Sequence, residues 1–414
     1  MQSLAIIGTG IAGMGCAHLL QKRYDITLFE KNEYTGGHTN TVTVSECGHP
    51  IAFDTGFMVF NYETYPRLTK LFSNINAPVI KTDMSFSVQH VPTGLEYSGS
   101  GFNGLFAQRK NLLSYSFIRM LKQINRFNKE SIRILDDPEF AGLSLQDFIN
   151  AFGFSKDMLW KYLIPMSSAV WSAPMDKMLN FPAQTLIRFF YNHGFLGLNT
   201  QHQWYTLDKG SQSYRELLIA PFRHRILNNL GVKSVVCREE KVLIKTFSGQ
   251  EHLFDKVIFA CHADEALALL EEPTGMQQTL LKPFHYQENI TTIHTDENLM
   301  PKTRRAWSSW NYRIIEREGT PIPTTIYWMN SLQKLNSTKN YFVSVSDPHT
   351  VNEEKVIRRI TYQHPLFDVP AIRAQKDLHR LNEHGPLYFC GSYFNYGFHE
   401  DAYVSALNLC EKIK

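Results

Sequence analysis

The feature that most constrains this chain is a glycine pattern close to its beginning, in the stretch LAIIGTGIAG. Gly8, Gly10 and Gly13 have the spacing G-x-G-x-x-G. Three glycines at this spacing occur by chance in many chains, so the meaning of the pattern depends on the segments around it.

The surrounding segments predict a strand, a tight turn, a helix and a second strand. Residues 3–8 form a short apolar run that is typical of a buried parallel strand. Residues 11–23 repeat apolar side chains with helical spacing, and residues 25–30 predict a strand that ends at Glu30. An acidic residue twenty positions after Gly10 completes the context in which such a loop indicates a dinucleotide-binding fold.

Each glycine has its own physical role in such a fold. Gly8 allows the tight turn, Gly10 lets the backbone approach a pyrophosphate, and Gly13 lets the helix pack closely on the strand. The first helical turn begins with Ile11 and Ala12, and its free N–H groups and positive dipole would favour the phosphates.

The residues after the second predicted strand favour FAD over NAD. Glu30 would accept hydrogen bonds from the adenosine ribose hydroxyls, and Lys31 beside it is included among the predicted contacts. Gly36 and Gly37 follow, and a second glycine pair suits a loop that passes over the pyrophosphate and the ribityl chain. NAD dehydrogenases normally proceed from the acidic residue into the next helix.

At this segment the sequence resembles the flavin-dependent amine oxidase and phytoene desaturase superfamily, where the pattern is E-x-x-x-x-x-G-G-R. His38 replaces the usual arginine, and we expect His38 and Thr39 to supply hydrogen bonds instead. The stretch IAFDTGFMVFN resembles the D-x-G turn of that superfamily. This resemblance implies that Asp54, Thr55 and Gly56 pass close to the flavin.

Two later segments extend the resemblance. Residues 231–270 look like the middle flavin-domain segment, in which the backbone near Val235 or Val236 would meet the adenine. The stretch LYFCGSYFNYGFHEDAYVSALNLCEKI resembles the closing motif, where a strand ends at glycine and a helix begins with G-A-x-x-S-G, although two of its glycines are missing here. The contacts that this motif implies are Gly391, Glu400, Ala402 and Tyr403.

A narrower resemblance runs nearly from end to end. AVWSAP, HTDENLMP and GFHEDAYVSAL are among the segments that resemble a bacterial subgroup of predicted NAD/FAD-binding, amine-oxidase-like flavoproteins. Members of this subgroup are often encoded near cyclopropane-fatty-acid-synthase-like methyltransferases, and related flavoproteins desaturate or isomerise fatty acyl or polyene chains. The resemblance implies FAD as cofactor, a lipid or fatty acyl substrate, and a lipid methyltransferase as a partner to be tested.

The superfamily plan implies an α/β fold, in which an α+β substrate domain is inserted in two pieces into a Rossmann-like FAD-binding domain. The predicted FAD-binding domain comprises residues 1–75, 205–270 and 375–414, and the predicted substrate domain comprises residues 76–204 and 271–374. Within the substrate domain the sequence predicts a β-hairpin followed by helices, and then strands in TIYWMN and YFVSVSD.

The reactive group is expected to be the flavin, whose N5 takes or returns a hydride. The sequence contains no His, Cys, Asp or Glu cluster with metal-ligand spacing and no G-x-S-x-G elbow. His399, at the flavin end of the closing motif, is the candidate proton acceptor or donor, and a structural histidine is the alternative. The candidate walls of an aromatic substrate pocket are Tyr62, Trp171, Trp328 and Tyr393.

Three functions stay open at this stage. The first is an FAD-dependent oxidoreductase that desaturates or isomerises an unsaturated or methyl-branched fatty acyl chain. An aromatic content of 13% and the lack of a charged constellation favour it. The second is a flavin amine oxidase, with Lys282, Lys302 or Lys334 as lysines to test. The third is a non-catalytic flavoprotein subunit that assists a lipid methyltransferase.

Composition places the chain among cytoplasmic proteins. A net charge of +3 gives no case for nucleic acid, and six scattered cysteines suggest reduced thiols. No signal peptide and no apolar run of about 18 residues are recognised. Residues 112–134 predict a basic amphipathic helix, which suits either peripheral contact with the inner face of the membrane or a solvated surface of the substrate domain.

Overall fold

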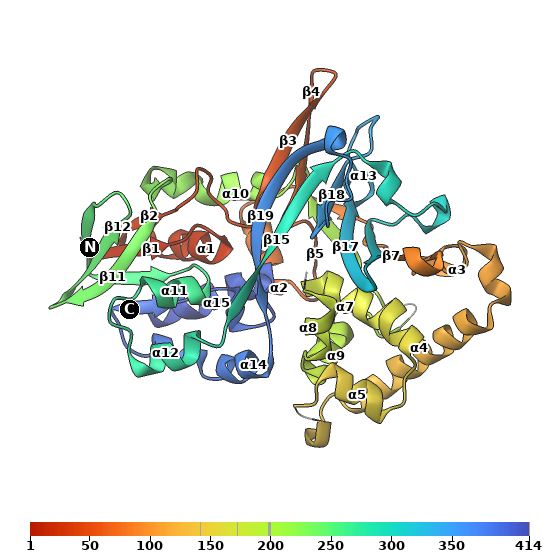
Figure 1. The fold of residues 1–414 in the computed structure, drawn as a ribbon. Coiled ribbons are helices and arrows are strands. Elements are labelled where there is room, and N and C mark those ends of the chain that lie inside the picture. Colours follow the sequence, from red (N-terminus) through yellow and green to blue (C-terminus); the bar gives the residue numbers. More distant parts are fainter. Residues whose placement is uncertain (141, 172, 198–199, 414) are drawn as a thin grey trace.

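A five-stranded parallel sheet carries the N-terminal glycine loop (Figure 1). The structure, a computed structural model, describes residues 1–140, 142–171, 173–197 and 200–413. The strands of this sheet, in spatial order, are β10 (Ile226–Leu227), β2 (Asp25–Phe29), β1 (Ser3–Ile7), β14 (Lys256–Phe259) and β20 (Leu387–Phe389).

Both faces of the parallel sheet are buried, which explains its nearly continuous apolar strands. Leu4 and Ile6 belong to the core that includes α1 (Ile11–Leu20) and α15 (His399–Lys412). Ala5 and Ile7 face the other way, toward an antiparallel sheet of three strands. Those strands are β11 (Val232–Arg238), β12 (Lys241–Thr246) and β13 (Glu251–Phe254).

A second large sheet has seven strands and mixed direction. Strands β16 and β7 are parallel, and the other neighbouring pairs are antiparallel. Two long strands of this sheet, β15 and β19, run through the middle of the molecule toward the parallel sheet (Figure 1). The spatial order is β19 (Val356–Leu366), β15 (His285–His294), β18 (Phe342–Val345), β17 (Thr320–Trp328), β16 (Trp310–Arg317), β7 (Phe86–His90) and β8 (Leu95–Ser98).

Short elements connect the two sheets. The hairpin of β3 (Thr41–Glu46) and β4 (His49–Asp54) projects at the top of Figure 1. A small sheet has three strands, which in spatial order are β5 (Phe60–Asn61), β9 (Trp204–Leu207) and β6 (Val79–Thr82). The connecting helices are α2 (Pro66–Asn74), α10 (Gln212–Ile219), α11 (Ala263–Leu269), α12 (Gly275–Leu281), α13 (Met329–Leu332) and α14 (Val369–Gln375).

A helical lobe fills the lower right of Figure 1. Its helices are α3 (Gly101–Leu105), α4 (Tyr115–Arg133), α5 (Leu145–Ala151), α6 (Lys156–Met158), α7 (Ile164–Trp171), α8 (Met175–Leu179) and α9 (Ala183–Asn192). The amphipathic helix α4 buries Phe117, Met120 and Phe127 against the lobe. No helix in the described part of the chain is long and apolar enough to span a membrane.

The predicted fold class is confirmed. The first strand, the first helix and the second strand appear as predicted, although the helix ends at Leu20, before the predicted end. The predicted hairpin is formed by β7 and β8, and helices follow it. The strand predicted in TIYWMN ends at Trp328, because the next residues form α13. The domain boundaries stay a prediction.

Candidate functional site

A cavity of about 1090 Å³ begins at the glycine loop, and we call it the cofactor cavity. It extends from β11 past the N-terminal end of α1 to the N-terminal end of α15, and then into the space below the seven-stranded sheet. Of the predicted site residues, those that line it are Gly8, Gly10, Ile11, Ala12, Glu30, Lys31, Gly37, His38, Gly56, Trp171, Gly391, Tyr393, His399 and Ala402.

In the first loop, Gly8 and Gly13 have no room for a side chain. Gly8 has a φ of 101°, and a Cβ there would lie 2.7 Å from the carbonyl oxygen of Ala260. A Cβ on Gly13 would lie 2.0 Å from the carbonyl oxygen of Gly8. Gly10 has open space instead, on the side that lines the cavity. The loop therefore fits a phosphate that approaches the backbone.

Glu30 is held at the carboxyl end of β2 by its neighbours. One carboxylate oxygen accepts hydrogen bonds from the backbone N–H and the hydroxyl of Thr9, at 3.2 and 2.5 Å. The other accepts from the backbone N–H and the side chain of Asn32, at 3.0 and 2.8 Å. These four hydrogen bonds match the about four acceptor positions of a carboxylate, so a ribose hydroxyl at the cavity wall would replace one of them. Lys31 is paired with Glu265 at 2.5 Å.

The second glycine pair lies against the first loop. Gly36 and Gly37 have φ values of 132° and 59°, and a Cβ on Gly37 would lie 3.3 Å from the Cα of Gly10. His38 follows and stacks on Tyr362 of β19, with ring centroids 4.9 Å apart. Of this group, Gly37 and His38 line the cavity, whereas Gly36 supports the turn by donating to the Thr9 hydroxyl.

The D-x-G turn brings only its glycine to the cavity. A Cβ on Gly56 would lie 2.3 Å from the carbonyl oxygen of His38, so the two segments touch. Asp54 is buried behind them and accepts hydrogen bonds from Thr41, Ser211 and Gln333. Thr55 reaches the cavity indirectly, through a 2.7 Å hydrogen bond to Tyr362. The structure thus places Asp54 as a buried support, away from the cavity wall.

The backbone of β11 approaches the cavity three residues earlier than predicted. Val232 and Lys233 line it, with Gly231 beside them, whereas Val235 is buried and bridges Leu270. The register of β11 against β12 is interrupted between Val232 and Ser234. This irregularity changes which backbone groups face inward, and no local sequence pattern indicates it.

His399 lines the cavity at the start of α15, but its Nε2 already has partners. It lies 2.9 Å from the Tyr214 hydroxyl and 3.1 Å from the Thr39 hydroxyl. Its ring stacks on Phe57, with centroids 3.9 Å apart. Burial lowers the pKa of His399 to about 3, so the imidazole is neutral. These contacts favour the structural alternative, in which His399 joins Thr39 to the C-terminal helix.

Two other predicted contacts at α15 face away from the cavity. Both carboxylate oxygens of Glu400 accept from the first turn of α2, one from the N–H of Arg67 and one from that of Leu68, each at 2.8 Å. Glu400 therefore caps α2, and the structure shows no approach to the ribityl position predicted for it. Tyr403 lies between α15 and α1, where a Cβ on Gly15 would touch its ring at 3.0 Å.

The far end of the cofactor cavity is an aromatic chamber. Trp171 contacts Phe189 and Phe398, with ring centroids 4.8 and 6.2 Å away. Trp310 and Tyr327 stack on the sheet side, 5.9 Å apart. The aromatic chamber is defined by Tyr65, Trp171, Phe189, Phe195, Trp204, Trp310, Tyr327 and Phe398. Most of these residues were not predicted, because an aromatic side chain in a strand or helix gives no sequence signal that separates a cavity wall from core.

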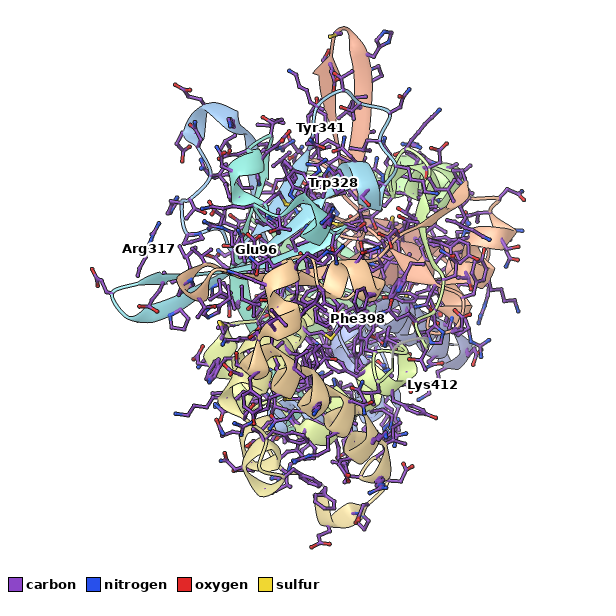
Figure 2. All side chains as sticks on the ribbon, turned by 90° about the vertical axis from the view of Figure 1, so that its right-hand side faces the viewer. Glu96, Arg317, Trp328, Tyr341, Phe398 and Lys412 are labelled. Carbon is purple, nitrogen blue, oxygen red and sulfur yellow. The ribbon has the colours of Figure 1, made fainter. Side chains whose placement is uncertain are left out.

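Three other predicted pocket residues take different places. Tyr393 is buried and lines the cavity beside Gly391. Tyr62 is half-exposed and packs on Tyr205, outside the cavity. Trp328 contacts Trp307 and donates to Asn340. In Figure 2, Trp328 lies in the upper, sheet-rich part of the molecule, above Phe398.

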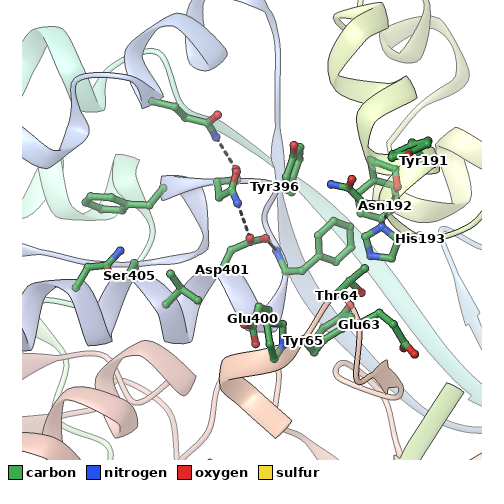
Figure 3. A pocket seen from close by; sticks show the side chains of 18 of the residues that line it. Glu63, Thr64, Tyr65, Tyr191, Asn192, His193, Tyr396, Glu400, Asp401 and Ser405 are labelled. Carbon is green, nitrogen blue, oxygen red and sulfur yellow. Dashed lines mark hydrogen bonds between the residues drawn. The ribbon is translucent and has the colours of Figure 1, made fainter. Parts of the chain in front are cut away.

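A second pocket of about 1170 Å³ adjoins the chamber, and we call it the side pocket. Both cavities share the wall residues Tyr65, Phe189, His193, Tyr396 and Phe398. Figure 3 shows Glu400 and Asp401 of α15 on one side of the side pocket and His193 on another. The Asp401 carboxylate accepts from the backbone N–H of Phe398 at 2.8 Å, and burial raises its pKa to about 7.

A metal centre is not part of the described structure, where no group of three or more His, Cys, Asp or Glu side chains is arranged to hold an ion. Lys282, Lys302 and Lys334 are all exposed, and none lines the cofactor cavity as the structure describes it. Among the described residues of its wall the lysines are Lys31, which follows β2, and Lys233, in β11.

The dinucleotide fold agrees with a family comparison. A family model described as an NAD(P)-binding Rossmann-like domain matches residues 6–75. The match includes the glycine loop, Glu30 and the second glycine pair. Comparison of the sequence with curated proteins gave no match. The N-terminal part of the chain is thus a dinucleotide-binding domain of the NAD(P)/FAD type.

Solved structures of oxidases and of an isomerase share the whole fold. Putrescine oxidase bound to putrescine is 12% identical, with a TM-score of 0.66 over 100% of this chain and 98% of that one. A CLA-producing fatty acid isomerase from P. acnes is 14% identical, with a TM-score of 0.67 over 100% and 98%. Cyclohexylamine oxidase from Brevibacterium oxydans is 14% identical, with a TM-score of 0.68 over 100% and 99%. The chain has the amine oxidase fold.

Proposed function

We propose that this protein is an FAD-dependent oxidoreductase that desaturates or isomerises an unsaturated or methyl-branched fatty acyl chain. When bound, FAD would supply a flavin N5 that exchanges a hydride with the substrate. Desaturation would also release a proton to solvent and pass the two electrons to an external acceptor, whereas isomerisation would return the hydride and leave the composition of the substrate unchanged.

The observation that carries this proposal is the distribution of charge along the cofactor cavity. The aromatic chamber continues directly from the dinucleotide end, and its walls bury apolar surface without offering an ion pair. The described charged residues on the cavity wall are Glu30, Lys31, Lys233, Glu265 and Glu288, which come from β2, β11, α11 and β15 and the residues next to them. An acyl chain suits such a chamber, because it needs buried area more than hydrogen bonds.

The P. acnes isomerase shows that this fold accommodates a fatty acid enzyme. That similarity supports the fold only, and the substrate proposal rests on the chamber. The chain's own residues would position a carbon chain between Trp171 and Trp310, exclude water from it, and keep the dinucleotide end polar.

The test is reduction of bound FAD without oxygen. Purified protein is loaded with FAD and mixed with unsaturated phospholipid, with free fatty acid, or with putrescine and cyclohexylamine. Bleaching at 450 nm by an acyl compound, together with a mass loss of two hydrogens or a moved double bond, supports the proposal. An isomerase that returns the hydride is detected by the moved double bond even when little bleaching accumulates.

A second candidate function is amine oxidation, which one feature of the side pocket favours. Four acidic residues, Glu63, Glu400, Asp401 and Glu411, line the described wall of this pocket, together with one lysine, Lys412. Such a wall would attract a protonated amine toward the aromatic chamber. Bleaching by an amine with release of peroxide, alongside inert acyl lipids, would establish this function instead.

The third alternative, a non-catalytic flavoprotein subunit, would be indicated if neither substrate class reacts. In that case the partner to test is a lipid methyltransferase, by co-purification and by its activity with and without this protein. A chain that binds no FAD at all would overturn all three alternatives.

A lipid substrate also requires a route from the membrane, and the surface beside α4 is our proposed contact. The apolar side of α4 packs inward, so it is not available to lipid. The start of this segment instead exposes Leu113, just before α4, and Tyr115, the first residue of α4, which are 94% and 81% exposed. Arg119 and Lys122 follow on the exposed side of the helix. Exposed apolar side chains beside cations fit an anionic lipid surface.

A further inference from the structure

Three histidines that are near one another line the cofactor cavity. His38 follows the second glycine pair, His262 precedes α11, and His364 lies near the end of β19. The rings of His38 and His364 are 5.3 Å apart, and the charges of His262 and His364 both act on His38. We call these residues the histidine trio, and all three line the cavity.

The histidine trio lies beside the loop that fits a diphosphate. Gly37, which precedes His38, touches Gly10 at the N-terminal end of α1. Ala260 and Cys261, which precede His262, touch Gly8 in the same loop. The trio and the phosphate-binding loop therefore border one region of the cavity.

The rest of this wall cannot neutralise a dianion. Arginine is absent from the described lining, and two lysines face three carboxylates. Lys31 is already paired with Glu265, and the helix terminus supplies only about half a positive charge. Two further histidines on the wall are occupied by protein groups, because His193 Nδ1 contacts the Phe189 carbonyl oxygen and His399 contacts two hydroxyls.

The trio is kept neutral in the protein alone and has free nitrogens. Burial, followed by repulsion from the other histidines, lowers the pKa of His38 well below its ordinary value. Burial lowers the pKa of His364 to about 4 and also lowers that of His262. His38 Nε2 and His262 Nδ1 are buried and have no hydrogen-bond partner in the described part of the chain. Each is a donor or acceptor that a ligand can use.

The groups that face the trio come from every neighbouring element. Around His262 they are Glu265 at 3.9 Å, Asp264, Lys31, Tyr286 and Gln363. His364 contacts the Asn289 side chain at 2.7 Å. His38 faces Tyr362 and, across the cavity, His399. Among the described neighbours, the carboxylates of Glu265 and Asp264 affect the pKa of His262, whereas His38 and His364 face other histidines and no carboxylate.

We propose that His38, His262 and His364 bind the diphosphate of FAD, and that at least one of them takes up a proton when FAD binds. This inference rests on FAD as the cofactor. The diphosphate supplies the missing negative charge, so protonated imidazoles become favourable only in the complex. The Kd for FAD therefore falls as the pH falls. This holds over the pH range in which the trio is neutral in the free protein and protonated in the complex.

The experiment measures protons and affinity, not turnover. Protein freed of cofactor is titrated calorimetrically with FAD at pH 6, 7 and 8, in buffers of different ionisation enthalpy. We expect uptake of about one proton per FAD and a Kd that rises about tenfold for each unit of pH increase while that proton is linked. ADP-ribose should show the same pH dependence, because its diphosphate does not titrate near neutral pH, whereas adenosine should show none.

Variants assign the protons to the trio. His364→Gln and His262→Gln should reduce the proton uptake and flatten the pH dependence of the FAD Kd. His38→Arg supplies a permanent charge and should do the same. The matched control is His285→Gln, an exposed histidine at the start of β15, which should behave as wild type. Circular dichroism melting identifies a variant that fails to fold.

The two failures can be told apart. FAD binding without proton uptake, or full uptake in His364→Gln, His262→Gln and His38→Arg alike, would overturn the role of the trio and leave the proposed function intact. A pH dependence shared by adenosine would also overturn it, because adenosine has no diphosphate. Absence of FAD binding at every pH would overturn the proposed function itself.

Discussion

Glu30 and His399 line the same cavity, and their hydrogen-bond partners differ. Glu30 accepts from Thr9 and Asn32 beside the glycine loop, and a ribose hydroxyl would replace one of these donors. The Nε2 atom of His399 is hydrogen-bonded to the hydroxyls of Thr39 and Tyr214. A cavity position alone therefore does not define a role, and the partners of each side chain decide it.

Glu30→Ala should weaken FAD binding because it removes the acceptor for the ribose hydroxyls. Loss of a charged hydrogen bond predicts about 1.5–3 kcal/mol, or about tenfold to a hundredfold in Kd. Fluorescence titration with FAD measures the change. The control is Glu33→Ala, an exposed acid three residues later, which should bind as wild type. Equal Kd values for the two variants would remove Glu30 from the cofactor site.

His399→Ala should lower stability more than it lowers the rate of flavin reduction. It removes the nitrogen that both hydroxyls contact, leaving Thr39 and Tyr214 bonded only to each other at this site, and predicts a loss of about 1–3 kcal/mol. His399→Gln keeps a polar atom near the same place and should recover part of the loss. Urea unfolding and anaerobic stopped-flow with the established substrate measure the two effects. A stable variant that is reduced about 10²–10⁴-fold more slowly would restore the proton-transfer role instead.

Residue roles were predictable where the cause is local. The close approaches of Gly8, Gly13 and Gly37 follow from spacing along a strand, a turn and a helix. Glu400 was not predictable, because its partners at residues 67 and 68 lie more than three hundred positions away in the sequence. Val235 was misplaced for a related reason, since a single irregularity in strand pairing moves the inward-facing positions.

At the scale of elements, α4 shows that an amphipathic pattern does not identify its partner. Phe117 and Phe127 pack against the helical lobe, and Arg126 folds back over the ring of Phe154 at 4.3 Å. The same alternation would suit a membrane surface, and only the packing decides between the two. The apolar side chains that are most exposed here, Leu113 and Tyr115, lie just before the helix and at its first residue.

Replacing Leu113 and Tyr115 together by serine should weaken binding to anionic vesicles by about tenfold, or about 1.4 kcal/mol, through lost apolar burial. Flotation with vesicles of phosphatidylglycerol and phosphatidylcholine measures it, and higher salt should also weaken binding. Leu253→Ser, at an exposed leucine of β13, is the control. Equal flotation of all three proteins would exclude this turn as the contact.

Elements with strong periodicity were predicted well, and their pairing was not. The β7–β8 hairpin follows from two alternating segments separated by a turn. The parallel pairing of β7 with β16 joins residues more than two hundred positions apart, so no local pattern reports it. The same nonlocal pairing forms the wall that carries Trp310 into the aromatic chamber.

At the scale of the whole molecule, bound FAD should contact both large sheets and so stabilise the folded state. The cofactor cavity is lined by the parallel sheet on one side and by β15 and β19 on the other. Binding to the folded state alone stabilises by about 2.7 kcal/mol when free FAD is a hundred times its Kd. We expect a higher Tm with FAD in differential scanning fluorimetry, and none of this gain with riboflavin, which lacks the diphosphate.

Without cofactor the protein should lose stability below about pH 6.5. Burial lowers the pKa of His193, His294 and His364 to about 4 and that of His399 to about 3. The unfolded chain takes up protons near the ordinary histidine pKa of about 6.5, so acid favours unfolding. Asp401, with its pKa raised to about 7, acts in the opposite direction, as do Asp54 and Glu400, whose pKa burial also raises; we expect the four histidines to outweigh them between pH 5 and 7. Urea unfolding at pH 5 and 7 checks the sign, and greater stability at pH 5 would contradict it.

The tie between residues 36–39 and the last helix has a consequence for biosynthesis. Thr39 and His399 are joined across the cavity, and β20 completes the sheet on which the glycine loop rests. Because β20 and α15 follow the glycine loop by more than three hundred residues, the binding site is incomplete until those later segments have been synthesised and have folded onto the loop. A chain that stops before β20 should therefore fail to retain the cofactor.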